Sequence, residues 1–92
     1  MALKITNNSL FSKHQLVLEP GSVKFYESTL LGGSRRFSYE RIDCVLLSPD
    51  NKLSFQVAAE VFSIPVRPGD PQHQPVIDAF VQAVQNSLSA NR

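Results

Sequence analysis

The chain of 92 residues contains no tryptophan and only one cysteine, Cys44. One cysteine cannot form an intrachain disulfide, so the fold must be stable without one, which suits a reducing compartment. The longest wholly apolar stretch, residues 44–47, is far too short to cross a bilayer, and the first residues lack the apolar run of a signal peptide. We therefore expect a cytoplasmic protein.

The sequence also lacks an excess of charge of either sign. Nine Lys and Arg residues oppose eight Asp and Glu, which leaves a formal net charge of +1. Such a balance supplies no strong field, so no nucleic-acid partner is predicted and peripheral membrane binding is not favoured. The hydrophobic fraction of 42% and the charged fraction of 18% are typical of a folded chain, and the length predicts a single domain over 1–92.

Motifs of catalysis and cofactor binding are missing as well. The chain has no nucleophile elbow, phosphate-binding loop or dinucleotide fingerprint. The carboxylates Glu40, Asp43 and Glu60 lie in no context that marks a catalytic pocket, and the two histidines and the cysteine do not show the short spacing of metal sites. We predict no enzyme, no catalytic residue, no metal, no cofactor and no small-molecule substrate.

What the sequence does contain is a series of short segments with an apolar residue at every second position. This period is typical of β-strands. Turn residues, among them Asn7-Asn8-Ser9, Pro20-Gly21 and Ser48-Pro49-Asp50-Asn51, separate the segments. A type II turn is expected at Pro20-Gly21, in a loop one or two residues longer than the tightest hairpin. The predicted strands cover about 2–5, 14–19, 22–28, 36–40, 42–47, 53–58 and 61–66.

Two of these segments carry more specific expectations. Residues 42–47 are nearly continuous in apolar character, which predicts a strand buried on both faces or at the meeting of two layers, with Cys44 as a small buried side chain. Pro65 cannot donate a ladder hydrogen bond, so it places the last strand at a sheet edge, or itself at the strand's end. Ala59-Glu60 is the expected hairpin turn before that strand, although neither residue favours positive φ.

After Gly69 the hydrophobic period changes to that of an α-helix. Asp70 is the expected N-cap and Pro71 the first helical residue of a helix over about 71–89. A start nearer 75 stays open, because Pro75 lacks an N–H and is tolerated only in a first turn. The apolar stripe that would cover the strands consists of Val76, Ile77, Phe80, Val81, Val84 and Leu88.

Seven short strands followed by one amphipathic helix resemble the pleckstrin-homology (PH) superfold. Gly32-Gly33-Ser34-Arg35-Arg36-Phe37-Ser38-Tyr39-Glu40-Arg41-Ile42-Asp43 is similar to the middle of small bacterial PH-like domains, and the resemblance continues through 66–70 into the helix. It implies a β-rich α+β fold, a seven-stranded split barrel. Four strands over about 2–40 and three over about 42–67 would form two antiparallel sheets packed nearly at right angles. The C-terminal helix would close the open end.

The resemblance implies a binding function without naming the ligand, because PH-like domains bind phosphoinositides, peptides or other proteins, or serve in assembly. We predict a non-catalytic protein-interaction or assembly module with a protein partner or self-association. The alternative is a module that binds an anionic lipid or another anion through Arg35 and Arg36, beside the glycine loop, with Lys4 and Lys13. Gln15 stands where phosphoinositide-binding members carry a further basic residue. Adjacent strand residues also point to opposite faces, so the two arginines need not act together.

Overall fold

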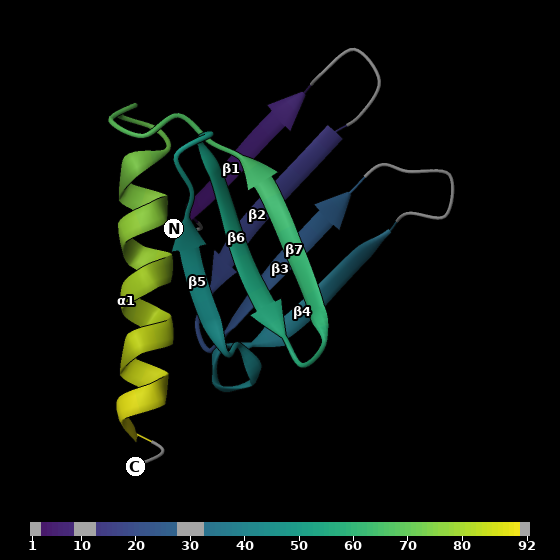
Figure 1. Ribbon diagram of the computed structural model, residues 1–92, viewed down its shortest axis with the longest axis vertical. Coiled ribbons are helices and arrows are strands. Elements are labelled where there is room, and N and C mark those ends of the chain that lie inside the picture. The colour runs from purple at the N-terminus through teal and green to yellow at the C-terminus, as the bar shows by residue number, and fades with distance from the viewer. Residues whose placement is uncertain (1–2, 9–12, 28–32, 91–92) are drawn as a thin grey trace.

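The computed structural model describes residues 3–8, 13–27 and 33–90 (Figure 1). The four-stranded sheet consists of β1 (Leu3–Asn8), β2 (Lys13–Glu19), β3 (Ser22–Glu27) and β4 (Ser34–Ser38), in that spatial order. The three-stranded sheet consists of β5 (Cys44–Leu47), β6 (Lys52–Val57) and β7 (Glu60–Pro65). The 3₁₀ helix η1 (Tyr39–Arg41) joins the two sheets, and α1 (Gln74–Ala90) ends the fold. All pairings are antiparallel, so the predicted division into four and three strands is confirmed.

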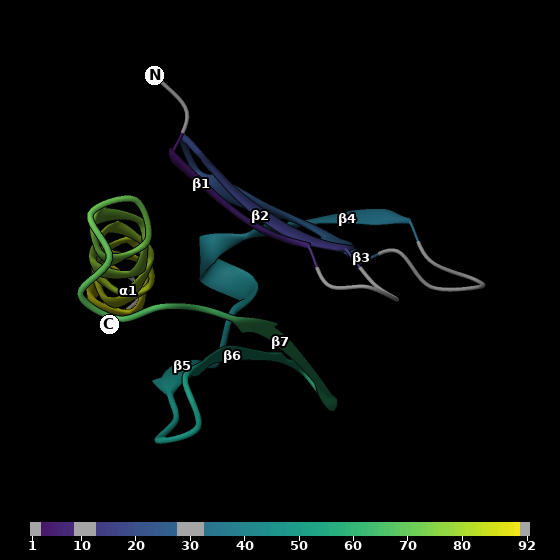
Figure 2. The same ribbon diagram turned by 90° about the horizontal axis from the view of Figure 1, so that it is seen from above.

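The two sheets form two layers whose strands cross steeply, and α1 lies at the side where the layers separate (Figures 1 and 2). The sheets do not close into a continuous barrel, and α1 packs against β1, η1 and β5 across the gap. The alternate residues of each strand that point between the layers build the core. Its largest fully buried side chains are Phe55, Phe80, Ile5, Leu16, Ile42, Leu53, Ile64 and Val23.

Helix α1 begins later than the predicted residue 71. Residues 71–73 form a turn, and Asp70 caps it through its Oδ1 atom, which accepts hydrogen bonds from the backbone N–H groups of Gln72 at 2.7 Å and His73 at 3.3 Å. The first helical residue is Gln74, so Pro75 lies in the first turn, where its missing N–H is tolerated. The predicted start at 71 is wrong, and the alternative near 75 is correct to within one residue.

The apolar stripe of α1 is shorter than predicted. Val76, Ile77, Phe80 and Val84 are at most 3% exposed, whereas Leu88 is 42% exposed and Val81 is only half-buried. Figure 1 shows the last turns of α1 extending beyond the strands. Helical periodicity predicts the face on which Leu88 lies, but the length of the sheets decides whether anything covers it.

Of the two alternatives predicted for residues 42–47, burial on both faces is wrong, because the strand contacts the core only on its inner side, through Val45. Strand β5 begins at Cys44 and is an edge strand, paired only with β6. Cys44, Leu46 and Leu47 are exposed, and the fully buried residue of this segment, Ile42, precedes the strand. The predicted burial of Cys44 therefore fails too. The apolar side chains Leu46 and Val61 on the outer face of this sheet stay in contact with solvent.

Several predicted turns differ in detail. Strand β1 continues to Asn8 instead of turning at Asn7, and β4 ends at Ser38, before the predicted strand end at Glu40. The hairpin between β2 and β3 is a tight loop of Pro20 and Gly21, because Glu19 pairs directly with Ser22. The second central position of a type II turn requires a positive φ, and Gly21 has φ +82°, so no longer loop is needed.

The last hairpin turns one residue earlier than predicted. Val57 pairs with Glu60, so Ala58 and Ala59 form the loop. Ala58 has φ +55°, a left-handed conformation that costs an alanine about 1 kcal/mol. The Asp43 Oδ2 atom accepts a 3.0 Å hydrogen bond from the N–H of Ala58, and the Nε2 atom of Gln56 donates to its carbonyl at 2.9 Å. These contacts hold the turn in place. Strand β7 is an edge strand that ends at Pro65, as predicted.

Candidate functional site

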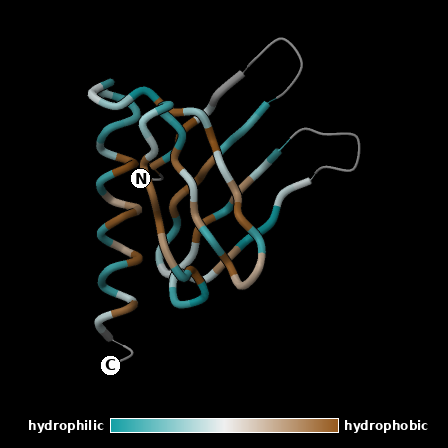
Figure 3. Tube along the Cα trace, viewed as in Figure 1, coloured by the Kyte–Doolittle hydropathy of each residue, from teal (hydrophilic) through white to brown (hydrophobic). Residues whose placement is uncertain are grey.

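Each sheet has one face in the core and one face turned outward, because side chains alternate along a strand. Figure 3 shows this alternation of hydrophobic and hydrophilic residues along the strands. The two layers lie face to face, so their outer faces point away from each other (Figure 2). These two outer faces differ in chemistry, and they are the candidate binding surfaces.

The outer face of the three-stranded sheet, here called the neutral face, carries a single charge. Its residues are Cys44, Leu46, Lys52, Ser54, Gln56, Val61, Ser63 and Pro65. Leu46 and Val61 are 62% and 63% exposed. They flank a shallow hollow of about 170 Å³ on either side of β6, lined also by Cys44, Ser54, Phe55 and Gln56. The sequence pattern alone did not reveal this surface, although strand alternation places Leu46 and Val61 on the side opposite to Val45, which packs against the core, and the core residue Ile64.

The polar side chains in the floor of this hollow already have partners. The Oγ atoms of Ser54 and Ser63 are 2.8 Å apart and share a hydrogen bond. The Sγ atom of Cys44 donates to Oε1 of Gln56 at 3.7 Å, and the amide of Gln56 holds the neighbouring turn. A polar group that is already satisfied costs little when a partner covers it. The hollow is therefore suited to contact with apolar side chains.

The outer face of the four-stranded sheet, here called the basic face, has the opposite character. Lys4 pairs with Val17, Val17 with Lys24, and Lys24 with Arg36, so the three cations lie in one row across the strands. The exposed Lys13 lies further along β2 with its side chain on the same face.

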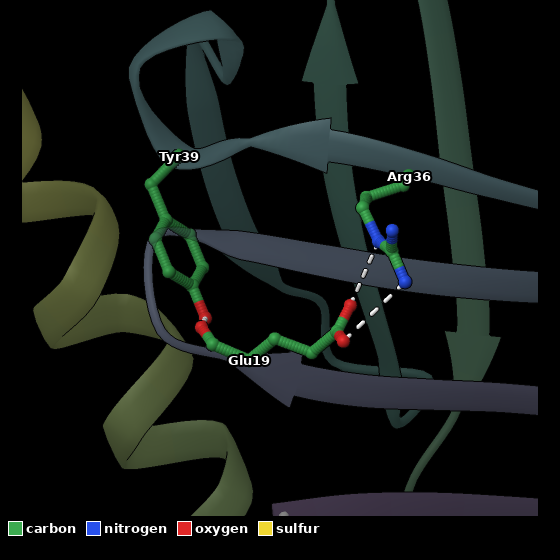
Figure 4. A network of polar contacts seen from close by, with 3 residues as sticks. All are labelled: Glu19, Arg36 and Tyr39. Carbon is green, nitrogen blue, oxygen red and sulfur yellow. Dashed lines mark hydrogen bonds and ion pairs between the residues drawn. The ribbon is translucent and has the colours of Figure 1, made fainter.

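One anion, Glu19, lies beside the row on the basic face. Its Oε1 and Oε2 atoms are 2.9 Å and 3.4 Å from Nε and Nη2 of Arg36 (Figure 4). The backbone carbonyl of Glu19 accepts a 2.9 Å hydrogen bond from the hydroxyl of Tyr39. Burial raises the pKa of the Tyr39 phenol above its usual value, because it disfavours the tyrosinate. Tyr39 therefore ties η1 to the end of β2 and fixes the backbone that carries the Glu19–Arg36 pair.

The structure separates the residues of the predicted anion site. Lys4, Lys13 and Arg36 lie on the basic face, while Arg35 lies on the other side of β4. Its Cζ atom is 5.3 Å and 5.1 Å from the ring centroids of Phe37 and Phe62, and its guanidinium is 3.0 Å from Glu60. The neighbouring arginines thus point to opposite faces, as expected from the strand period. Gly32 of the glycine loop lies outside the described residues.

Lys24 is the member of the row that sequence analysis missed. It follows Val23 in an alternating strand, so its outward direction could be inferred from the sequence. Its neighbours across the sheet, Val17 and Arg36, depend on strand order and register, which the sequence pattern leaves open.

Most of the groups considered for catalysis or metal binding have other contacts. His73 is buried, and its Nδ1 atom accepts a 3.0 Å hydrogen bond from the N–H of Arg67. His14 lies 3.9 Å from Glu27, while Asp43 caps a turn and Glu60 pairs with Arg35. Within 3–8, 13–27 and 33–90, no group of three or more His, Cys, Asp or Glu could hold a metal ion. The same residues include no helix long and apolar enough to span a bilayer.

The arrangement of elements matches a solved structure. The N-terminal PH domain of human ARAP2, determined in solution, superposes with a TM-score of 0.57 over 96% of this chain and 75% of that chain. The fold is PH-like. The two sequences are 16% identical, so the likeness concerns the fold and does not transfer a ligand. No protein-family model matches the sequence. No curated protein matches it either. In this PH-like fold the neutral and basic faces lie on the two opposite layers, and the bacterial origin suggested by the resemblance stays a prediction.

Proposed function

We propose that this PH-like domain is a non-catalytic interaction module that self-associates, with a second copy of the chain docked on the neutral face. The observation that carries the proposal is the pair of exposed side chains, Leu46 and Val61, on either side of a hollow in a face with one charge. Single exposed apolar residues are ordinary, but two that flank one hollow form the start of a contact surface.

Charge favours a second copy as the occupant. In a two-fold dimer each face meets itself, so every charge near the axis faces its own like charge. The neutral face avoids this repulsion, because Lys52, its only charge, lies at the first residue of β6. The basic face would oppose cations to cations. Of the two outer faces, the charge distribution therefore favours assembly through the neutral face.

Shape supports the same arrangement. Leu46 lies on β5 and Val61 on β7, with β6 between them. A two-fold axis between the faces and parallel to β6 brings Leu46 of one copy beside Val61 of the other, over the satisfied Ser54–Ser63 pair. Both apolar side chains of each copy are then covered, and no polar group in the floor of the hollow loses its partner.

The small size of the face predicts modest affinity. Three strands spaced about 4.8 Å apart and up to six residues long cover roughly 300 Å² in projection. Stable dimers usually bury about 800 Å² per partner. We therefore expect a dissociation constant on the order of 0.1–1 mM, with rapid exchange between monomer and dimer.

Sedimentation equilibrium between about 0.02 and 2 mM protein, a range that brackets this affinity, tests the proposal. The native chain should shift from monomer to dimer within that range. The double variant Leu46→Ser, Val61→Ser should stay monomeric, because serine leaves no apolar surface to bury. The matched control is Leu88→Ser, which removes another exposed leucine, on α1, and should dimerise like the native chain.

Three results would contradict this function. The native chain could remain monomeric at about 2 mM, which is above the expected dissociation constant. The control could lose dimerisation as completely as the double variant. A native monomer could instead bind a different protein through Leu46 and Val61. The neutral face would then be a binding surface for that protein, and the self-association proposal would be wrong.

The alternative prediction, anion binding by Arg35, Arg36, Lys4 and Lys13, has weaker support as a single site. Arg35 is engaged with Glu60 and two aromatic rings on the side of β4 opposite to Arg36. One small anion could not contact both guanidinium groups without breaking those interactions.

A further inference from the structure

The near-neutral net charge conceals a marked separation of charge. On the basic face Lys4, Lys13, Lys24 and Arg36 outnumber the one anion, Glu19. The other charged residues in the described ranges have an acidic excess: Glu27, Glu40, Asp43, Asp50, Glu60, Asp70 and Asp78 against Arg35, Arg41, Lys52 and Arg67. One side of the domain is therefore positive and the remainder negative. Such a distribution orients a molecule toward an anionic surface even when its net charge is small.

The cations of the basic face are available for a ligand. Among the described residues no ion pair joins Lys4, Lys13 or Lys24 to a carboxylate, and only Arg36 is paired, with Glu19. Neighbouring strands are about 4.8 Å apart, so the row from Lys4 to Arg36 spans roughly 14 Å across the sheet. Several cations can thus contact one extended anionic surface at the same time.

The composition of this face favours a lipid surface over a protein. The centre of a protein interface is usually apolar and aromatic and is depleted in lysine. Here the centre of the row is Lys24 beside Val17. The one aromatic residue that strand alternation places on this face, Tyr26, is half-buried, so the described strands offer no large exposed apolar anchor here. A bilayer with anionic lipids requires no such anchor, because each Lys or Arg near its surface adds an independent electrostatic contribution.

We propose that the basic face docks flat on a bilayer containing anionic lipids, through Lys4, Lys24, Arg36 and Lys13. The contact is with the averaged negative surface rather than with one headgroup in a pocket. The neutral face then points away from the bilayer, because the two sheets turn their outer faces in opposite directions (Figure 2). The two surfaces share no residue, so failure of self-association would leave this proposal standing, and the reverse also holds.

Co-sedimentation with vesicles provides the test. Vesicles of phosphatidylcholine with about 30 mol% phosphatidylserine should bind the chain at about 0.05 M NaCl and release it at about 0.5 M, where screening is strong. Vesicles of phosphatidylcholine alone should not bind it. The double variant Lys4→Gln, Lys24→Gln should partition about 25-fold more weakly, since each cation contributes about fivefold. The matched control Lys52→Gln, Arg67→Gln removes the same charge from outside the basic face and should change binding less than about twofold.

A variant that should increase binding to the vesicles strengthens the test. Glu19→Gln removes the anion of this face and frees Arg36, while the hydrogen bond from Tyr39 uses the backbone and is kept. Binding should increase about fivefold or more. The control Glu60→Gln frees Arg35 on the other side of β4 and should produce a smaller increase.

Each remaining outcome overturns the proposal. The native chain could fail to bind anionic vesicles at low salt. The double variant Lys4→Gln, Lys24→Gln and its control Lys52→Gln, Arg67→Gln could weaken binding equally. Binding would then respond to the net charge of the chain rather than to this face. Soluble poly-glutamate could bind the basic face as tightly as vesicles do, with the same response to Lys4→Gln, Lys24→Gln. The ligand would then be an acidic polypeptide and not a bilayer.

Discussion

The contact of α1 with the sheets should carry a large share of the stability, and Phe80 is the residue that tests this. Its side chain is fully buried, with its ring centroid 5.5 Å from that of Phe55 in an edge-to-face arrangement and 6.4 Å from that of Tyr39. Truncation to alanine removes the ring from the place where helix, β6 and η1 meet. Buried Phe→Ala substitutions cost about 3–5 kcal/mol, against a total stability of about 5–15 kcal/mol for a small domain.

Urea unfolding followed by far-ultraviolet circular dichroism measures the effect, because the chain has no tryptophan to report by fluorescence. We expect Phe80→Ala to lower the free energy of unfolding by about 3–5 kcal/mol. Leu88→Ala, on the same helix but exposed, should change it by less than about 0.5 kcal/mol.

If Phe80→Ala does not fold at all, Phe80→Leu provides a milder change of about 1–2 kcal/mol. A loss below about 1 kcal/mol for Phe80→Ala, or equal losses at positions 80 and 88, would refute the claim that α1 stabilises the fold by closing the gap between the sheets.

Two further predictions concern turns and pH. Ala58→Gly should raise the free energy of unfolding by about 1 kcal/mol, because Ala58 has a left-handed φ that glycine adopts without strain. The control Ala59→Gly should lower the free energy of unfolding by about 0.5–1 kcal/mol, and a loss at both positions would contradict the assigned turn. Tyr39→Phe should cost about 1 kcal/mol at neutral pH through the lost hydrogen bond to Glu19. Because the pKa of Tyr39 is raised on folding, its ionisation should destabilise the native chain as pH rises above the unfolded value of about 10, and Tyr39→Phe should lack this part of the alkaline loss in urea titrations.

Strand periodicity predicted most of the architecture correctly because it reflects local geometry. The alternation of apolar residues located the strands and the buried side of each, including Phe25, Phe55 and Ile64. Prolines and glycines located the turns, and the change of period after Gly69 located the helix. The errors at Asn7, Pro20 and Ala58 are shifts of one to three residues, since turn boundaries depend on which residues pair across the hairpin.

The larger errors concern neighbours that are distant in sequence. An apolar run such as 44–47 reads the same in a buried strand and in an edge strand, and only the assembled sheet shows that β5 has one pairing partner and an uncovered face. For the same reason Leu46 and Val61 were not recognised as candidates for binding. The exposure of Cys44 follows from this arrangement as well.

The sequence by itself determined the number of strands, the presence of one long C-terminal helix and the residues of each strand that share a side, although it did not reveal the 3₁₀ helix η1. It also determined that Arg35 and Arg36 point apart. Only the tertiary structure decided strand order and register, and with them the row of Lys4, Lys24 and Arg36 and the hollow between Leu46 and Val61. The physical reason is that local backbone geometry sets the direction of each side chain, whereas the packing of the whole chain selects which side chains become neighbours.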